Sequence, residues 1–317
     1  MTAVAARSSR GVALALLSAA TFGSSGAVAA SLLQAGWSAG AAVFFRLAVA
    51  AVALTVPALL ALRGRWELLR RRAGAVVVFG VMAVAGCQVC YFNAVQHLSV
   101  GVALLLEYLA SVLVVGWLWL RHGARPRPLT IGGTALAVLG LVLVLDVTGS
   151  TRVDLVGVLW GLAAAVGLVV YFVMSARGED EVPPVVMAWA GMVVGAVLLG
   201  VLALLGLLPF TASGGRVVLL DHRVSALVPV LWLALGAAAL AYVAGIGAAR
   251  LLGPKVASFV GLSEVLFAVL FAWALLHQLP AAVQVAGGVV VVAGIALVRL
   301  DELREPPALL ETAALPT

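Results

Sequence analysis

Long apolar stretches follow one another along this chain, separated by short segments that contain arginine, glycine and proline. An α-helix needs about 20 predominantly apolar residues to cross the hydrocarbon core of a bilayer, and most of these stretches reach that length. The pattern predicts ten membrane-spanning helices, at residues 11–34, 41–62, 74–96, 99–120, 128–146, 154–175, 184–208, 225–249, 255–276 and 281–299. The longest connection between them is expected at about residues 209–224.

The chain also contains an internal repeat. Residues 94–144 align with residues 248–298 at a constant offset of 154 and without a gap, pairing Trp119 with Trp273, Pro126 with Pro280, Gly133 with Gly287 and Gly140 with Gly294. Five helices per half is an odd number, so the second half is expected to enter the membrane in the inverted direction. The predicted fold is an all-α membrane protein with repeats at 1–147 and 148–299 and a disordered cytoplasmic tail at 300–317.

Arginine and lysine are distributed unevenly over the predicted loops. If the N-terminus lies inside the cell, only Arg152, Arg216 and Arg223 fall outside, and the other loop arginines and Lys255 fall in the cytoplasm. Cytoplasmic loops of membrane proteins carry an excess of these residues. The sequence therefore predicts a multi-pass protein of the plasma or inner membrane with both termini in the cytoplasm, and an uncleaved first helix is favoured over a signal peptide.

Composition supports a membrane protein and excludes several other classes. The chain is 64% hydrophobic and 10% charged, whereas soluble domains contain about 25% charged residues. The net charge of +6 is explained by membrane orientation, so no nucleic-acid partner is expected. Cys87 and Cys90 are interpreted as small apolar side chains, and no metal or cofactor is expected. The expected partners are the lipid bilayer and a small-molecule substrate, and a homodimer is left open.

Several segments resemble the EamA family of the drug/metabolite transporter superfamily. LLSAATFGSS (16–25) is similar to the family's first-helix pattern, with Phe22 in place of a tryptophan, and VFFRLAVAAVAL (43–54) is similar to its second-helix pattern. Residues 94–120 resemble helices 3 and 4, and residues 249–276 resemble helices 8 and 9, although Val265 stands where the family often has proline. The resemblance implies a carrier of small metabolites, chiefly amino acids, that often works outward.

Three charged residues, Arg46, Glu107 and Glu264, lie within predicted spans. A charge at a helix centre costs about 2.5–3.5 kcal/mol on insertion scales, so such residues normally face a bundle interior or a water-filled cavity. Arg46 and Glu107 have similar depths in their spans, which allows an ion pair between them. Glu264 lies near the midplane, where a low dielectric favours the protonated carboxyl. A structural role and a role in binding substrate or proton are both open for each residue.

Other polar and aromatic residues are candidates for a central cavity. Gln88 and Tyr91 share one face of the third predicted span, Asn93 lies on another face, and Ser263 precedes Glu264. Aromatic residues well inside spans complete the set, namely Trp160, Trp189 and Tyr242. Packing inside the bundle is the alternative role for each of these aromatic residues. The predicted substrate- or proton-binding set is Arg46, Gln88, Tyr91, Asn93, Glu107, Trp160, Trp189, Tyr242, Ser263 and Glu264.

Other functional classes fit the sequence less well. Gly23-Ser24-Ser25-Gly26 matches the serine pattern of rhomboid-like proteases, but all four histidines lie in or beside loops, so no base is expected near that serine. A channel would be expected to show charged rings or a filter loop. We therefore expect a carrier without enzymatic activity that exports small metabolites such as amino acids by alternating access. Efflux of hydrophobic cations is the alternative, which would gain support if Arg46 were already paired.

Overall fold

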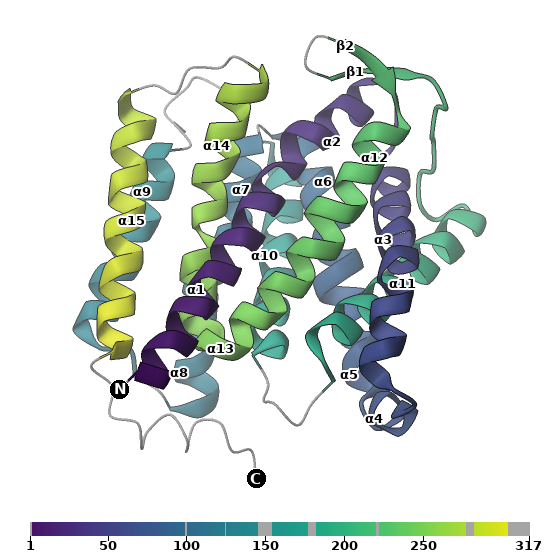
Figure 1. Ribbon diagram of the computed structural model, residues 1–317. Coiled ribbons are helices and arrows are strands. Elements are labelled where there is room, and N and C mark those ends of the chain that lie inside the picture. Colours follow the sequence, from purple (N-terminus) through teal and green to yellow (C-terminus); the bar gives the residue numbers. More distant parts are fainter. Residues whose placement is uncertain are drawn as a thin grey trace.

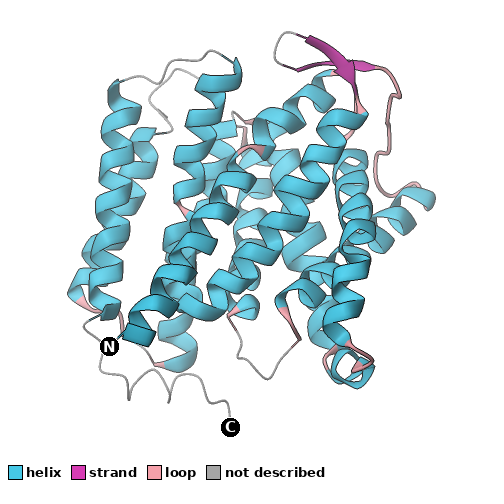
Figure 2. Ribbon diagram, viewed as in Figure 1, coloured by secondary structure: helices cyan, strands magenta, loops and turns pink. Residues whose placement is uncertain are grey.

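A computed structural model describes residues 2–98, 100–123, 125–144, 154–176, 182–219, 222–276 and 282–303 (Figure 1). Nearly all of the regular structure in these residues is helical (Figure 2). The first half of the chain forms α1 (Thr2–Gly23), α2 (Ser25–Gln34), α3 (Ala39–Leu62), α4 (Trp66–Arg71), α5 (Ala73–Val78), the π-helical segment η1 (Phe79–Gly86), α6 (Cys87–His97), α7 (Val100–Tyr108), α8 (Ala110–His122) and α9 (Pro128–Val144).

The second half forms a similar series of helices. Its elements are α10 (Leu155–Ser175), α11 (Pro184–Leu204), β1 (Arg216–Leu219), β2 (His222–Ser225), α12 (Leu227–Ala234), the π-helical segment η2 (Leu235–Leu240), α13 (Ala241–Gly261), α14 (Ser263–Leu276) and α15 (Ala282–Leu303). The predicted all-α fold class is confirmed, and the long connection before α12 contains, in addition, a short antiparallel hairpin of β1 and β2 that was not predicted. The side chain of Val217 in β1 is buried, and it attaches the short hairpin to the rest of the protein by an apolar contact.

Six helical segments in the described part of the chain are long and apolar enough to cross a membrane. They are Ser8–Gln34, Ala39–Leu62, Ala73–His97, Leu155–Ser175, Pro184–Leu204 and Leu227–Gly261, and Pro128–Leu143 and Val285–Val298 are shorter apolar helices. Three of the predicted spans are interrupted, because the chain turns at Ser24 between α1 and α2, at Leu109 between α7 and α8, and at Leu262 between α13 and α14. The total of ten spans therefore stays a prediction.

The interruptions fall at corresponding places in the two repeats. The π-helical segment η1 follows α5, and η2 follows α12, close to where the offset of 154 places it. The break between α6 and α7, directly after Leu98, is a second correspondence. The offset of 154 places this break at Gly253, where a φ of 76° and a ψ of 165° interrupt α13 just before Pro254. The sequence repeat is thus accompanied by a repeat in helix geometry, including the irregular positions.

The last helices of the repeats, α9 and α15, lie side by side at one edge of the bundle (Figure 1). A Cβ atom added to Gly133 would lie 2.8 Å from the carbonyl oxygen of Gly294, and one added to Gly140 would lie 2.8 Å from that of Gly287. Because Gly133 corresponds to Gly287 and Gly140 to Gly294, each repeat contributes the same pair of glycines to the contact. Small residues of this kind allow two helix backbones to approach closely.

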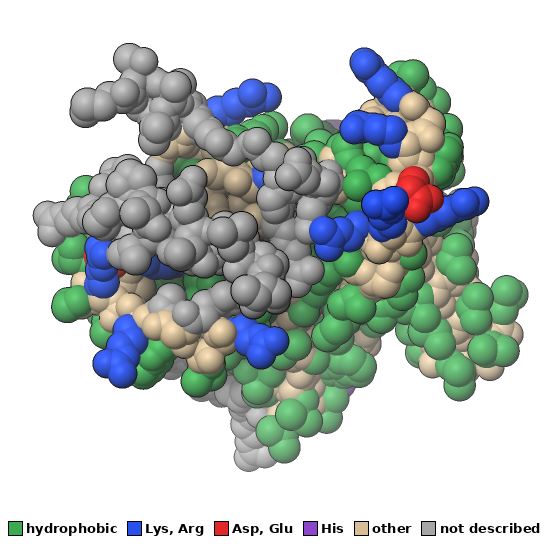
Figure 3. Space-filling view, turned by 90° about the horizontal axis from the view of Figure 1, so that it is seen from below, with side chains coloured by type: hydrophobic (Ala, Val, Ile, Leu, Met, Phe, Trp, Pro, Cys, Tyr) green, Lys and Arg blue, Asp and Glu red, His purple; other side chains and the backbone are tan. Residues whose placement is uncertain are grey.

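One end of the bundle collects basic side chains. Lys and Arg stand out on the face drawn in Figure 3, which is seen from the end where α1 begins and where α4 lies in Figure 1. α15 ends at the same end of the bundle (Figure 1). The polar tail was predicted to start at residue 300, but Leu300 still belongs to this helix. That part of the prediction is wrong because the helix continues to Leu303, and residues 304–317 lie outside the described residues.

Candidate functional site

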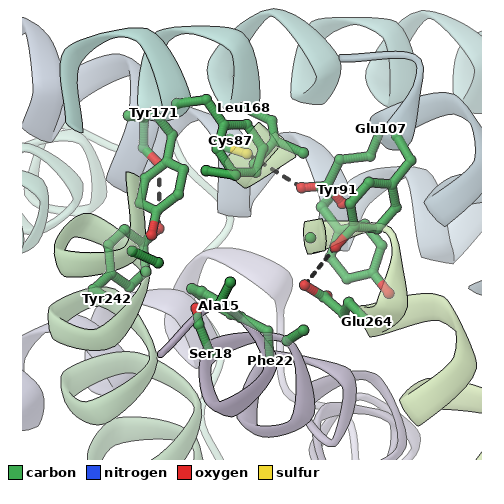
Figure 4. Close-up of a pocket in the computed structure, with 18 of the residues that line it drawn as sticks. Ala15, Ser18, Phe22, Cys87, Tyr91, Glu107, Leu168, Tyr171, Tyr242 and Glu264 are labelled. Atoms are coloured by element: carbon green, nitrogen blue, oxygen red, sulfur yellow. Dashed lines mark hydrogen bonds between the residues drawn. The ribbon is translucent and has the colours of Figure 1, made fainter. Parts of the chain in front are cut away.

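A cavity lies inside the helical bundle, between helices of both repeats (Figure 4). It is lined by α1, α2, η1, α6 and α7 from the first half and by α10, α13 and α14 from the second. Its volume is about 50 Å³, which holds roughly three to five water molecules. The lining side chains with a polar atom or a thiol are Ser18, Ser25, Cys87, Gln88, Tyr91, Glu107, Tyr108, Tyr171, Tyr242 and Glu264.

The carboxyl groups of Glu107 and Glu264 lie on one side of this cavity, together with Tyr91 (Figure 4). Tyr108 Oη donates a hydrogen bond to Glu264 Oε2 at 2.6 Å. The thiol of Cys87 donates to Glu107 Oε1 at 3.3 Å, and its sulfur also lies 3.4 Å from the carbonyl oxygen of Ala164. Each carboxyl group is therefore held by one neutral donor, and acceptor positions remain for a ligand.

Aromatic rings form the other side of the cavity. Tyr171 contacts Tyr242 edge to face with ring centroids 5.5 Å apart, and it contacts Phe172 at 5.2 Å. Phe22 meets Tyr242 at 5.2 Å. Tyr171 is 5% exposed, yet its hydroxyl has no hydrogen-bond partner among the described residues. An unpaired buried hydroxyl costs free energy, so this group is available to a ligand or a water molecule in the cavity.

The difference between the two sides follows from substitutions at equivalent positions of the repeat. Tyr91 and Glu107 correspond to Gly245 and Gly261 by the offset of 154. A Cβ atom at Gly245 would lie 2.0 Å from Tyr171 Oη, and one at Gly261 would lie 3.1 Å from Cζ of Phe172. The first repeat thus supplies a phenol and a carboxyl group, whereas the second supplies glycines that make room for two aromatic rings of α10.

Arg46 lies beside the cavity but does not line it. Its Nη1 donates to Gln88 Oε1 at 2.8 Å, and its Nη2 donates to the carbonyl oxygen of Ala237 in η2. The centre of its guanidinium lies 5.8 Å from the centroid of the Phe22 ring. The predicted ion pair between Arg46 and Glu107 is therefore wrong: both residues belong to the described part of the chain, and no ion pair joins them.

A second hydrogen bond crosses between the repeats in a related way. Tyr242 Oη donates to the carbonyl oxygen of Ala83 in η1 at 3.2 Å. Ala83 corresponds to Ala237 and Gln88 to Tyr242 by the offset of 154. A π-helical segment disturbs the regular backbone ladder, and such segments are frequent at functional sites. Each repeat thus uses one π-helical carbonyl to accept a hydrogen bond from a side chain of the other repeat.

The comparison with known families agrees with this two-part construction. The sequence profile of the EamA-like transporter family matches the chain twice, at residues 9–146 and 155–300. The chain belongs to the EamA-like transporter family. Resemblance to the EamA family, expected from the helix patterns, is thereby confirmed, and membership supports a transporter of the drug/metabolite transporter type.

The fold of this EamA-like transporter also has counterparts among solved structures, of which 27 chains match. One of them, described only as "Crystal structure of protein", superposes with a TM-score of 0.68 and has 21% sequence identity. The alignment covers 95% of this chain and 99% of the other. At this identity the likeness shows a shared fold and nothing about substrate. No curated protein matches the chain.

Five of the ten site residues predicted from the sequence line the cavity of the EamA-like transporter, namely Gln88, Tyr91, Glu107, Tyr242 and Glu264. Arg46 lies next to it. The other four residues were predicted to line a central cavity, and they do not line it. Asn93 Nδ2 donates to Val89 O in its own helix, Trp189 Nε1 donates to Thr55 on α3, and Ser263 Oγ donates to Val260 O beside the turn before α14. Trp160 is 36% exposed on the outside of the bundle.

Other residues that line the cavity of the EamA-like transporter were not predicted, among them Ser18, Phe22, Tyr108, Tyr171 and Phe172. The signal that could have found Tyr171 is a helical stripe on α10, where Gly161, Ala164 and Tyr171 are buried at spacings of three and seven residues. Cys87, interpreted as a small apolar side chain, lines the cavity and bonds to Glu107. Nothing in the spacing of the cysteines indicates that contact.

The serine motif has a structural role in this EamA-like transporter. Ser24 lies at the break between α1 and α2, and Trp232 Nε1 donates to its hydroxyl oxygen at 2.9 Å. His97 lies 3.0 Å from Asp154 at an exposed position. The amide of Val156 and then His97 hold the pKa of Asp154 below its ordinary value. Among the described residues, no histidine forms a hydrogen bond with Ser24, as a catalytic serine would require.

Gly245→Ala should impair transport in this EamA-like transporter while leaving a folded protein. The added Cβ atom would meet Tyr171 Oη at 2.0 Å and Ser18 Oγ at 2.7 Å, so the tyrosine must leave its position in the cavity wall. Overpacking of this kind costs about 1–3 kcal/mol. Gly247→Ala is the matched control on the same helix, because its Cβ atom would only touch Leu14 at 3.4 Å. The measurement is counterflow in proteoliposomes alongside thermal stability in detergent, and equal transport by both variants would contradict the role of Tyr171.

Proposed function

We propose that this EamA-like transporter is a secondary-active carrier that exports a small metabolite bearing an amino group by alternating access. The proposal includes ten spans in two inverted repeats, with the cavity between the repeats as the substrate site. The observation that carries it is the pair of carboxyl groups, Glu107 and Glu264, in a buried cavity lined by helices of both repeats. Binding at the interface of inverted repeats allows one bundle to rock against the other and to expose the site to each side in turn.

Charge balance favours exchange of the substrate for a proton. A buried ion without a partner is costly, so a cavity that changes its occupant is most stable when its net charge stays constant. A carboxyl group that releases a proton as an ammonium group enters keeps that charge unchanged. Glu264, whose side chain is bound by a neutral tyrosine, and Glu107, bound by a thiol, both offer this exchange.

Orientation in the membrane is part of the same proposal. The end of the bundle that carries many basic side chains is proposed to face the cytoplasm, as the excess of lysine and arginine in cytoplasmic loops favours (Figure 3). Both termini would then be cytoplasmic, and the hairpin of β1 and β2 would lie outside, in the plasma or inner membrane. Labelling of single cysteines placed in α4 and in the hairpin with an impermeant reagent tests this orientation.

The carrier mechanism is tested by counterflow. Proteoliposomes loaded with unlabelled tyrosine or tyramine should transiently accumulate the labelled form of the same compound, because a carrier exchanges substrate through one alternately exposed site. At least one of the two compounds should show saturable counterflow, which an imposed pH gradient should accelerate. The control is vesicles that contain the Glu107→Gln and Glu264→Gln double variant. Flux that rises linearly with concentration, or an absence of counterflow across a broad panel of amino acids and amines, would contradict the proposal.

A further inference from the structure

The cavity wall has no partner for a substrate carboxylate. Among its described residues it contains two carboxyl groups and no lysine, arginine or histidine. An amino acid brings a carboxylate as well as an ammonium group, and a buried carboxylate needs an opposite charge or several donors. Arg46 is the nearest candidate, but its two terminal nitrogens are bound to Gln88 and Ala237. Its Nε has no hydrogen-bond partner in the described part of the chain, yet the side chain is 0% exposed and presents no surface to the cavity.

The net charge of the ionisable side chains at the cavity is balanced by a ligand with one positive charge. With both carboxyl groups ionised, Glu107, Glu264 and Arg46 carry a net charge of −1. A single ammonium group neutralises this set, whereas a zwitterion leaves it unchanged and adds a carboxylate among carboxylates. Buried charges are tolerated when they are compensated, so the arrangement favours a monovalent cation over an amino acid.

The other side of the cavity fits an aromatic body. Tyr171 and Tyr242 present rings there (Figure 4), and Phe172 and Phe22 contact them. The Tyr171 hydroxyl has no hydrogen-bond partner among the described residues. Aromatic rings pack favourably against one another edge to face, and their faces attract cations. A molecule with a charged amine at one end and a ring with a polar tip at the other satisfies both sides of the cavity at once.

From these observations we infer that the substrate is a monovalent arylalkylammonium cation without a carboxylate, bound with its amine between Glu107 and Glu264 and its ring against Tyr171 and Tyr242. The inference rests on the proposed carrier function and narrows its substrate class. It also assigns Arg46 to the protein framework, where it joins the two repeats through Gln88 and Ala237, and excludes it as the receptor of a substrate carboxylate.

A matched series of four compounds tests the substrate class on the wild-type carrier in proteoliposomes and in detergent. Tyramine and tyrosine share the ring and the amine, and they differ only by the carboxylate. Tyrosine amide keeps the bulk of that group without its negative charge, and N-acetyltyramine keeps the ring without a positive charge. Each compound is measured as an unlabelled competitor of labelled tyramine counterflow and as a ligand that raises the temperature of thermal unfolding.

Tyramine and tyrosine amide should compete at least tenfold more strongly than tyrosine, and N-acetyltyramine should not compete. Counterflow and competition by tyrosine at least equal to those of tyramine would overturn the cation inference and leave the carrier proposal intact. If tyrosine amide were as weak as tyrosine, the size of the group rather than its charge would set the preference, and the charge argument would be wrong. Failure of all four compounds, with counterflow of another solute, would also reject the inference but not the carrier.

Discussion

Glu264→Gln and Glu107→Gln should each lower proton-driven transport by roughly 10- to 100-fold. A hydrogen bond to a charged group contributes about 1.5–3 kcal/mol, and 1.4 kcal/mol is a tenfold change in binding. Glutamine has nearly the same shape, and its amide oxygen can still accept from Tyr108 or Cys87, so the packing around the cavity is retained. The variants therefore remove the negative charge, and with it the attraction for an ammonium group and the exchange for a proton.

The measurement compares uptake driven by a pH gradient with counterflow in the absence of a gradient. Tyr108→Phe removes only the neutral donor to Glu264 and should have a smaller effect than Glu264→Gln. Glu67→Gln is the matched control, because Glu67 lies in an exposed pair with Arg71 on α4, where its carboxyl group lies 3.1 Å from the arginine Nε. The role of the cavity carboxyl groups would be wrong if both variants kept wild-type uptake and wild-type pH dependence.

The repeat in the sequence predicted more of the fold than the apolar lengths alone. The offset of 154 aligns Gly133 with Gly287 and Gly140 with Gly294, and in the structure these four glycines meet in the crossed order, Gly133 against Gly294 and Gly140 against Gly287. It also aligns the break after Leu98 with the break at Gly253. The lengths of apolar stretches, by contrast, could not reveal the turns at Leu109 and Leu262, because a broken helix in an apolar environment keeps the same composition as a continuous one.

The charged residues of the site were predictable, but their partners were not. Intramembrane Glu107 and Glu264 stand out because charge is rare in an apolar span, and both line the cavity. The aromatic side of the cavity depends on Gly245 and Gly261, where the absence of a side chain admits Tyr171 and Phe172 from another helix. An absence of atoms leaves no signal in a pattern of apolar and polar residues, so this side could be found only from the packing.

Arg46 illustrates the same limit more sharply. Depth in the membrane allowed a pair with Glu107, but a guanidinium chooses among all acceptors within reach, including backbone carbonyl groups. The carbonyl of Ala237 is such an acceptor because it belongs to a π-helical segment, and no sequence pattern indicated that segment. Predictions of buried ion pairs from depth therefore need the local backbone geometry of every helix nearby.

Arg46→Met should destabilise the protein strongly, and Arg46→Lys should not restore its stability. The arginine binds Gln88 and Ala237 with two separate nitrogens, which a single ammonium group cannot reproduce. Loss of hydrogen bonds to a buried charge costs about 2–3 kcal/mol, which corresponds to roughly 5–10 °C in the unfolding temperature. Because these bonds connect the two repeats, transport should fall together with stability.

A double-mutant cycle tests whether Arg46 binds Gln88, as in the structure, or Glu107, as its depth in the membrane suggested. Arg46→Met combined with Gln88→Leu should lower the unfolding temperature by less than the sum of the single effects, because both changes remove the same hydrogen bond. Arg46→Met combined with Glu107→Gln should come closer to additivity, since no hydrogen bond joins these side chains and only their longer-range attraction is lost. Strong coupling to Glu107 with none to Gln88 would restore the ion pair between Arg46 and Glu107, and it would remove Glu107 from the two carboxyl groups assigned to the substrate amine. Because Arg46 binds Gln88 and Ala237 rather than Glu107, both carboxyl groups remain for the amine of a substrate.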